Sequence, residues 1–404
     1  MANPVAAERG LAAVPRGVWV LGLVSMCMDL SSELVHSLLP LYMATALGAS
    51  VFVIGIIEGV AEALALIVKL FSGVLSDAFR KRKPLVLFGY GLAAVSKFAF
   101  PLAPTLAWIV GARFADRVGK GIRGAPRDAL ITDITPANAR GRSFGLRQAL
   151  DTVGAIGGPL MAIGAMAYFA GDFRAAFWIA VVPAMLAVML IVVGVDEPDR
   201  MDARPVDSPR LRLSDIRRLP RSYVIVVTIA AVLTLARFSE AFLVLRAQNI
   251  GFSDATAPLV MVAMAAVYAA TSYPAGALAD RGHGARLLSC GLAALVAADL
   301  VLAHADSRWL VLAGAALWGL HMGLTQGLLS ALVAGSAPAD LRGTAFGAFN
   351  LVCGIALLLA SGLAGWLWDA VGPRFTFYAG AAFTVVAWAG FLRYGARAAT
   401  LPRA

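Results

Sequence analysis

Ionisable side chains lie inside long apolar segments of this sequence, where they could bind or move charge. Asp29, Glu33 and His36 are four and three residues apart, so they share one face of a helix. A charged side chain at the centre of a bilayer costs about 2.5–3.5 kcal/mol on insertion scales. Such groups therefore pair with one another or line a water-filled cavity. A carboxylate in such a cavity can bind a proton from one side of the membrane and release it to the other.

The second half of the chain repeats part of this pattern. Ser32-Glu33 and Ser239-Glu240 occupy comparable places in the two halves. We therefore expect Asp29 or Glu33 in the first half and Glu240 in the second half to carry protons. The remaining polar groups near the middle of their segments would attract a substrate or hold the carboxylates in place, and these cavity candidates are Arg117, Lys120, Arg123, Arg237, His321 and Gln326.

Other charged residues favour a different interpretation. Lys97 and Asp299 lie alone in segments expected at the periphery, which favours a local structural role. Glu58 and Glu62 are one turn apart near the non-cytoplasmic end of the second segment, and we expect water to solvate them there.

The composition is that of a membrane protein. The 404 residues are 60% hydrophobic and 14% charged, whereas soluble domains are about 45–50% apolar and about 25% charged. The net charge of +10 does not indicate nucleic-acid binding, because the basic residues gather at the ends of apolar segments, where they act as topology signals. The three cysteines lack metal-ligand spacing, so we expect no metal site and no cofactor.

The chain contains an internal repeat of about 200 residues. Gly48 and Asp77 are 29 residues apart, and so are Gly251 and Asp280. Ala139-Arg-Gly-Arg-Ser-Phe-Gly145 likewise returns as Leu341-Arg-Gly-Thr-Ala-Phe-Gly347. A duplicated block of apolar helices predicts two similar bundles that face each other across a central substrate site.

About 20 residues are needed for a helix to cross the hydrocarbon core, which divides the chain into twelve expected spans. The spans are 17–43, 50–75, 84–103, 105–131, 143–168, 174–195, 222–246, 255–279, 284–304, 308–334, 343–368 and 374–393. The predicted fold is therefore an all-α membrane protein with two pseudo-symmetric six-helix bundles. We expect the first bundle in residues 1–195, a polar linker in 196–221 and the second bundle in 222–404.

The short loops predict the orientation. Most basic residues fall on one side, at 80–83, 140, 142, 281, 286 and 342, while the other side has little beyond 174, 308 and 374. The positive-inside rule then places both termini and the linker in the cytoplasm, in a bacterial-type cytoplasmic membrane.

Gly73-x-Leu75-x-Asp77, followed by four basic residues from Arg80, closes the second span, and Gly276-x-Leu278-x-Asp280 repeats it. This motif resembles the loop between helices 2 and 3 of the major facilitator superfamily, the twelve-helix secondary transporters. The resemblance implies a conformational latch that holds the two halves together on the cytoplasmic side. Its candidate members are Gly73, Asp77, Arg80, Arg82, Arg127 and Asp280.

Two further motifs are similar to the same family. Arg117-x-x-Lys120-Gly121-x-Arg123 resembles the helix-4 motif that the family ties to proton transfer, although Lys120 replaces a neutral residue. Span 5 looks like the glycine-proline motif of the family's proton-exchanging exporters, and its members are Gly145, Gly154, Gly158 and Pro159. Glycines at such intervals also allow close helix packing by themselves.

The function predicted from these features is proton-coupled export of a small molecule by a monomeric transporter with no nucleic-acid partner. The alternative is a proton-coupled importer of a small organic anion, favoured by the cationic fourth span. Soft side chains around Cys27, Met261, Met264 and Met322 make a transition-metal transporter the third hypothesis. We do not expect an enzyme, because the sequence has no nucleotide-binding loop and no nucleophile–base set.

Overall fold

The computed structural model describes residues 14–78, 81–136, 139–197, 218–338 and 341–395, and within these ranges it contains helices and no strands. The α-helices of the first half are α1 Arg16–Thr45, α2 Val51–Ala78, α3 Lys83–Ala99, α4 Leu106–Ile134, α5 Arg140–Tyr168 and α6 Phe173–Gly194. Those of the second half are α7 Arg221–Ala236, α8 Ala241–Asn249, α9 Leu259–Leu278, α10 Gly284–His304, α11 Arg308–Ser336, α12 Arg342–Ala370 and α13 Pro373–Gly390. Two short π-helices, η4 Ala279–His283 and η6 Phe391–Gly395, follow α9 and α13.

Long apolar helices make this an integral membrane protein. Eight segments of the described chain are long and apolar enough to cross a membrane by themselves. Helix α4 is not among them, because five charged side chains fall between residues 113 and 123. Large apolar side chains cover the outer surface, as a lipid-facing protein requires; examples are Phe88, Val95, Val182 and Val193.

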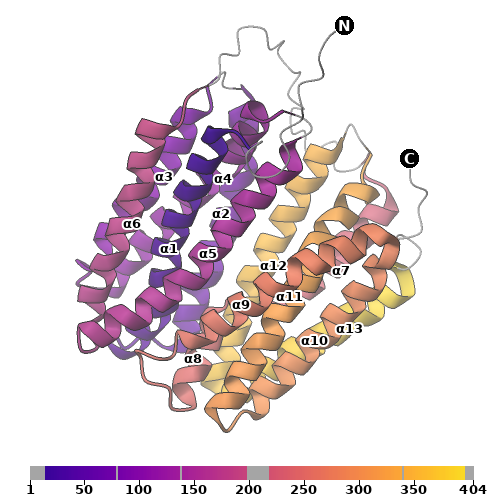
Figure 1. Ribbon diagram of the computed structural model, residues 1–404. Helices are drawn as coiled ribbons and strands as arrows, with labels where there is room; N and C mark the ends of the chain where they lie inside the picture. Colours follow the sequence, from indigo (N-terminus) through magenta and orange to yellow (C-terminus); the bar gives the residue numbers. More distant parts are fainter. Residues whose placement is uncertain (1–13, 79–80, 137–138, 198–217, 339–340, 396–404) are drawn as a thin grey trace, which may run out of the picture.

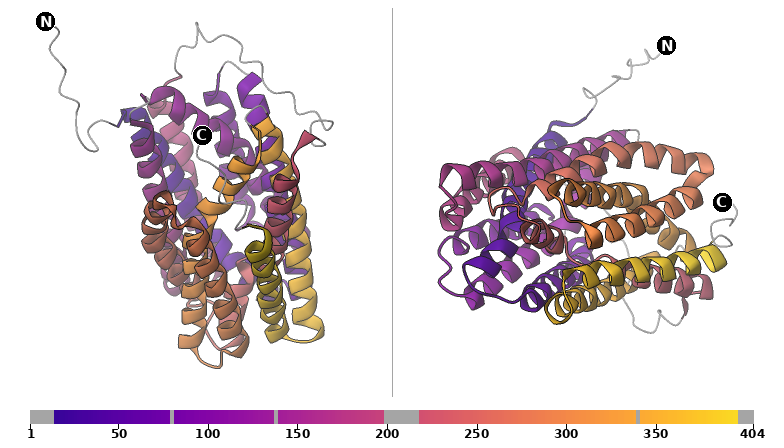
Figure 2. Two further views of the ribbon diagram at one scale, coloured as in Figure 1. Left: turned by 90° about the vertical axis from the view of Figure 1, so that its right-hand side faces the viewer. Right: turned by 90° about the horizontal axis from the view of Figure 1, so that it is seen from below.

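Packing partners recur between the two halves of the chain. Helix α1 packs on α5 and α6, and α4 packs on α2 and α3. At the corresponding places, α7 packs on α12 and α13, and α11 packs on α9 and α10. Figure 1 shows α1–α6 together on one side and α7–α13 on the other, and the view from below in Figure 2 agrees. The repeat in the sequence is thus accompanied by a recurrence of packing partners among the helices.

The two halves meet most closely where α2 begins and α12 ends. A methyl group added to Gly59 would lie 3.0 Å from the Cα of Leu358, and one added to Gly55 would collide with the Ser361 carbonyl. The Phe52 amide also donates a hydrogen bond to Asp369 Oδ2 at 2.8 Å. We call this end of the molecule the far side, and the opposite end, where α1 begins and α13 ends, the terminal side.

The hydrophobic cores confirm which side is closed. Leu41 of α1 belongs to the core of the second half, and Leu245 of α8 belongs to a core of the first half, so the cores interlock on the far side. On the terminal side, the cluster around Val18 lies wholly in the first half, and the cluster around Tyr223 lies wholly in the second. Among the described residues, the apolar cores that the two halves share lie on the far side.

The expected span 222–246 is interrupted in the structure. Helix α7 stops at Ala236 and α8 starts at Ala241, which leaves Arg237–Glu240 outside helical structure. The Ser361 hydroxyl of α12 accepts a hydrogen bond from the freed Ser239 amide at 3.1 Å. The Phe238 ring is anchored among three aromatic rings, which belong to Phe242, Trp318 and Phe377. A broken helix inside a membrane is stable because other groups satisfy its free backbone atoms.

Candidate functional site

A cavity of about 510 Å³ lies between the two halves. It is on the terminal side of the α2–α12 contact, because its walls use α2 from Glu62 and α12 up to Leu357. The first half contributes a charged wall that contains Glu33, His36 and Arg117, whereas the wall of the second half is largely apolar. The apolar side chains include Met261, Met264, Trp318, Met322 and Phe349. Such a chamber can hold a molecule that has both a charged and an apolar part.

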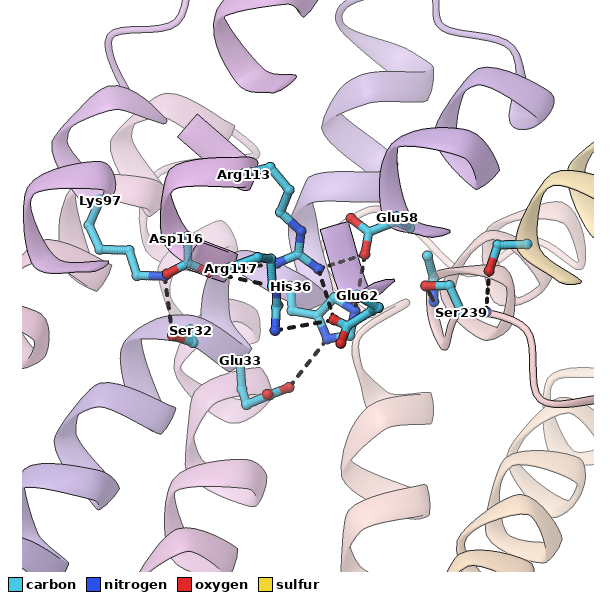
Figure 3. A network of polar contacts seen from close by, with 12 residues as sticks. Ser32, Glu33, His36, Glu58, Glu62, Lys97, Arg113, Asp116, Arg117 and Ser239 are labelled. Atoms are coloured by element: carbon cyan, nitrogen blue, oxygen red, sulfur yellow. Dashed lines mark hydrogen bonds and ion pairs between the residues drawn. The ribbon is translucent and has the colours of Figure 1, made fainter. Parts of the chain in front are cut away.

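Two ion pairs join α2 to α4 behind the charged wall. Arg113 Nη2 bonds to Glu58 Oε2, and neither side chain is exposed to solvent. One helical turn further along both helices, Arg117 Nη1 lies 3.1 Å from Glu62 Oε1. Figure 3 shows these four side chains converging beside His36. Both helices therefore use the same spacing of four residues, which lets two carboxylates meet two guanidinium groups in register.

Lys97 and Asp116 extend this network toward α3. Lys97 Nζ donates to Asp116 Oδ1 at 2.7 Å and to Ser32 Oγ at 3.2 Å, and Lys97 and Asp116 are buried. Arg113 and Arg117 approach Asp116 Oδ2 at 3.9 and 3.8 Å. The network thus connects α1, α2, α3 and α4, so a change of charge at one member acts on all four helices.

His36 lies between the cavity and the buried pair. Its Nδ1 atom is 3.5 Å from Glu33 Oε2, and its Nε2 atom is 3.7 Å from Glu58 Oε2. Glu33 lines the cavity together with His36, whereas Glu58 is completely buried behind the ring. The imidazole is therefore the direct physical connection between a carboxylate in the cavity and a carboxylate outside it.

Helix α5 positions the two acidic residues of α1. A methyl group added to Gly154 would lie 2.7 Å from Asp29 Cβ, and one added to Gly158 would lie 2.6 Å from Glu33 Cβ. These two glycines thus let α1 pack directly on α5, with the acidic residues at the points of contact. Gly145 has no atom of another element within 4 Å of that position, so it does not share this packing role.

The predicted cavity residues separate into two groups. Glu33, Glu240, Arg117, Lys120, Arg237 and Gln326 line the cavity. Four of these, Lys120, Arg237, Glu240 and Gln326, form no ion pair or side-chain hydrogen bond with another described residue. Asp29, Arg123 and His321 do not belong to the cavity wall. The Arg123 guanidinium lies over the Tyr90 ring, and His321 Nδ1 is 2.8 Å from the Gly291 carbonyl oxygen on α10.

Comparison with known proteins identifies the family. The model of the Major Facilitator Superfamily matches residues 21–356 and, again, 241–403. The chain belongs to the major facilitator superfamily. An uncharacterised MFS-type transporter of Methanocaldococcus jannaschii is 31% identical over 379 residues, which cover 92% of this chain and 93% of that protein. Proteins of this family carry small molecules across membranes, so this chain is a membrane transporter.

Solved structures of the superfamily share the fold. The nucleoside transporter NupG superposes with a TM-score of 0.74 at 13% identity, covering 94% of this chain and 99% of that one. The human organic anion transporter MFSD10 gives a TM-score of 0.66 at 20% identity, covering 93% of this chain and 98% of that one.

The superfamily latch motif is only partly described. Arg80 and the side chain of Asp77 lie outside the described residues. Gly73 faces Ala125 of α4, and Arg82 pairs with Asp133 at 3.1 Å, so both contacts stay within the first half. Asp280 is exposed in η4.

Arg127, the remaining latch candidate, belongs to a second polar cluster inside the first half. Its Nη1 atom donates to Ser25 Oγ at 2.6 Å, and its guanidinium also contacts Asp128 at 3.1 Å. Arg147 of α5 lies 3.2 Å from Asp151 and 3.5 Å from Asp128. These contacts tie α1, α4 and α5 together at the terminal side.

The structure places two charged residues differently from what the sequence predicted, and with Arg113 these are further candidates for the site. Glu58 was expected in solvent but is completely buried, and Lys97 was expected to be isolated but is paired. Arg113 carries the buried pair with Glu58. The signal that could have found them is the shared spacing of four residues: Glu58 and Glu62 on one span match Arg113 and Arg117 on another.

Soft side chains also meet in the cavity, which bears on the transition-metal hypothesis. Met261, Met264, Met322 and Cys353 line its wall. Within the described ranges, however, no group of three or more His, Cys, Asp or Glu side chains could hold a metal ion.

Proposed function

We propose that the protein is a proton-coupled secondary transporter that exports a small molecule by alternating access. The observation that carries this proposal is the cavity between the halves, whose wall contains the carboxylates Glu33, Glu62 and Glu240. A carboxylate that lines a cavity avoids the free-energy cost of contact with lipid. Its protonation can be linked to a conformational change of the protein. The glycine-proline motif of α5, which resembles that of proton-exchanging exporters, supports the outward direction.

The transport cycle that we propose is a rocking motion of two six-helix bundles, residues 1–195 and 222–404, around the cavity. The excess of Lys and Arg in the loops on the terminal side supports a cytoplasmic location for both termini. With that orientation, the contact between α2 and α12 is the closed extracytoplasmic gate. The cavity then faces the cytoplasm, where an exporter loads its substrate.

A second candidate function is import of a small organic anion with protons. Lys120 and Arg237 favour it, because both are cations in the cavity without an ion-pair partner among the described residues. Two free cations attract one or two negative charges of a substrate. The apolar wall around Met264 and Trp318 would hold the remainder of that molecule.

Proteoliposomes that contain the pH indicator pyranine test the coupling. Organic acids, amino acids, nucleosides and cationic dyes are added one at a time outside the vesicles, and the luminal pH is followed. We expect at least one compound to move protons in a protein-dependent manner, and we expect Glu33→Gln and Glu240→Gln to abolish that movement. Normal proton movement in both variants, or none with any compound in the wild type, contradicts the proposal.

The direction of transport is measured separately. A pH gradient is imposed across vesicles of known protein orientation, and accumulation of the active compound is followed. Exchange predicts movement against the proton gradient, whereas the importer predicts movement with it.

A further inference from the structure

We propose that His36 carries protons between Glu33 in the cavity and Glu58 behind the cavity wall. This inference rests on the proposed proton coupling and adds the route that a proton takes. Glu58 is reached from the cavity through the imidazole, because the ring contacts Glu33 through one nitrogen and Glu58 through the other. A ring that bridges two carboxylates in this way can pass a proton through itself.

Two polar atoms at the ring lack a hydrogen-bond partner and are therefore available for proton transfer. His36 Nε2 and Glu58 Oε1 are both buried without a hydrogen-bond partner. The two distances, 3.5 and 3.7 Å, exceed a hydrogen bond by about half an ångström. Contacts used for proton transfer are often long before the substrate binds and shorten afterwards. A small rotation of the ring would therefore complete either connection.

Charged groups face His36 from each packed element. Glu33 shares α1 with the ring, Glu58 and Glu62 approach from α2, and Arg113 and Arg117 approach from α4. Glu240, at the break before α8, and Lys120 line the same cavity. Both guanidinium groups are paired with carboxylates. The carboxylates therefore offset the positive charge of the arginines near the imidazole ring. Glu33 and Glu58 are the two acceptors within reach of its nitrogens.

The transfer step conserves protons and needs no other reactant. When Glu58 is protonated, its O–H gives a proton to Nε2 of the neutral ring while the Nδ1–H proton passes to the Glu33 carboxylate. Glu58 becomes a carboxylate, Glu33 becomes a carboxylic acid, and the ring stays neutral in its other tautomer. The starting tautomer is restored by a later flip of the ring. It is also restored when Nδ1 takes up a proton and Nε2 releases one.

Protonation of Glu58 would also affect Arg113, its ion-pair partner. A protonated Glu58 attracts Arg113 less, and Arg113 already lies 3.9 Å from both Glu62 and Asp116. Glu58 is adjacent to Gly59, which packs on Leu358 at the α2–α12 contact. We therefore infer that the far side supplies protons to Glu58 when this contact opens, and that His36 delivers them to the cavity when it is closed.

Nitrogen-15 NMR of the full-length protein, labelled at histidine and held in lipid nanodiscs, tests this route without a transported compound. The chain has four histidines, so each ring can be assigned by single substitution. Ring tautomer and N–H exchange with water are recorded from about pH 5 to about pH 8, where imidazole changes charge. We expect Glu33→Gln to slow N–H exchange at His36 by at least about tenfold. We expect Glu58→Gln to fix the ring in one tautomer.

The controls separate proton transfer from a general disturbance. Asp128→Asn removes a carboxylate of the first half that pairs with Arg127 and Arg147 and does not contact the ring, so exchange at His36 should stay within about twofold of the wild type. The signal of His304, an exposed ring on α10, should be unchanged in every variant and reports intact folding. If His36 keeps a single tautomer at every pH, or exchanges equally fast in Glu33→Gln, the proposed route is wrong. Because no transport is measured, this outcome is independent of the proteoliposome result.

Discussion

At the scale of single residues, pairing decides which charges this membrane protein can bury. Arg113 and Glu58 are both inaccessible to solvent, and each is the other's principal partner. The desolvation of two charges offsets most of their attraction, so such a pair adds little net stability relative to well-packed apolar side chains. Losing one partner is different, because the remaining charge is then buried without its principal partner. The presence of the pair is therefore weak evidence for added stability.

The Glu58–Arg113 pair gives the first prediction. Either Glu58→Ala or Arg113→Ala should reduce the free energy of unfolding by up to about 3–5 kcal/mol, because the charge that stays buried loses its principal partner. The double variant Glu58→Leu with Arg113→Leu should recover most of that loss. Thermal unfolding of the purified protein, followed by tryptophan fluorescence, measures each change.

Lys120→Ala is the matched control for this series. Its side chain is exposed in the cavity and has no ion-pair partner among the described residues, so its melting temperature should equal that of the wild type. The double Leu variant could instead lose as much unfolding free energy as the two single variants together. That result would show that the charges stabilise the fold.

The free cations of the cavity lead to the second prediction. Lys120→Gln and Arg237→Gln should each raise the KM for an anionic substrate several-fold, because a positive charge in a partly desolvated site is lost. The KM for a neutral compound should change little. Transport is measured in proteoliposomes at several salt concentrations, and the effect should shrink as salt screens the charges. A larger effect on neutral compounds would contradict an anion-binding role.

At the scale of helices, close packing of α5 on α1 positions the acidic residues. Gly154 and Gly158 are one turn apart and contact Asp29 and Glu33 in the same order. Both glycines belong to the small-residue pattern for which the sequence analysis considered close helix packing, but the sequence could not specify the partner helix. That partner depends on tertiary packing, which one sequence does not encode locally.

Alanine substitutions in α5 provide the third prediction. Gly158→Ala should destabilise the protein by about 1–3 kcal/mol, because the new methyl group overlaps Glu33 Cβ. Gly164→Ala is the control on the same helix. No neighbour lies within 4 Å of that position, and alanine should stabilise the helix there by up to about 1 kcal/mol. Equal melting temperatures for the two variants would show that α1 and α5 are less closely packed than the structure indicates.

Sequence patterns predicted the helices well and their long-range contacts poorly. Apolar length places helices such as α10 at 284–304 to within a residue, because each must cover the bilayer by itself. The break at Arg237–Glu240 was missed, because no proline or glycine marks it. The Ser239 amide within the break donates a hydrogen bond to Ser361, which is 122 residues away in the chain. Burial of Glu58 was missed for the same reason, since it requires α2 and α4 to be neighbours.

At the scale of the whole molecule, the structure is one state of a transporter. Apolar cores join the two halves on the far side, whereas on the terminal side each half has its own core. In the transport cycle proposed above, the change to the opposite state separates the α2–α12 contact and closes the terminal side. Packing between helices has few alternative arrangements, so such a change involves a discrete movement of one half against the other.

Cys353 makes this state accessible to a chemical test, which is the last prediction. The thiol lines the cavity and is one of three cysteines, so replacing Cys27 and Cys290 leaves it as a single site for labelling. A membrane-impermeant maleimide should label Cys353 faster in inside-out vesicles, where the cytoplasmic side is exposed, than in right-side-out vesicles. Gly59→Leu should reverse this preference, because a side chain larger than a methyl group cannot fit against Leu358 when the far side is closed. Gly91→Leu is the control, since no neighbouring atom lies within 4 Å of that position. If the preference for one vesicle orientation is the same in Gly59→Leu and Gly91→Leu, the contact between α2 and α12 does not control access to the cavity.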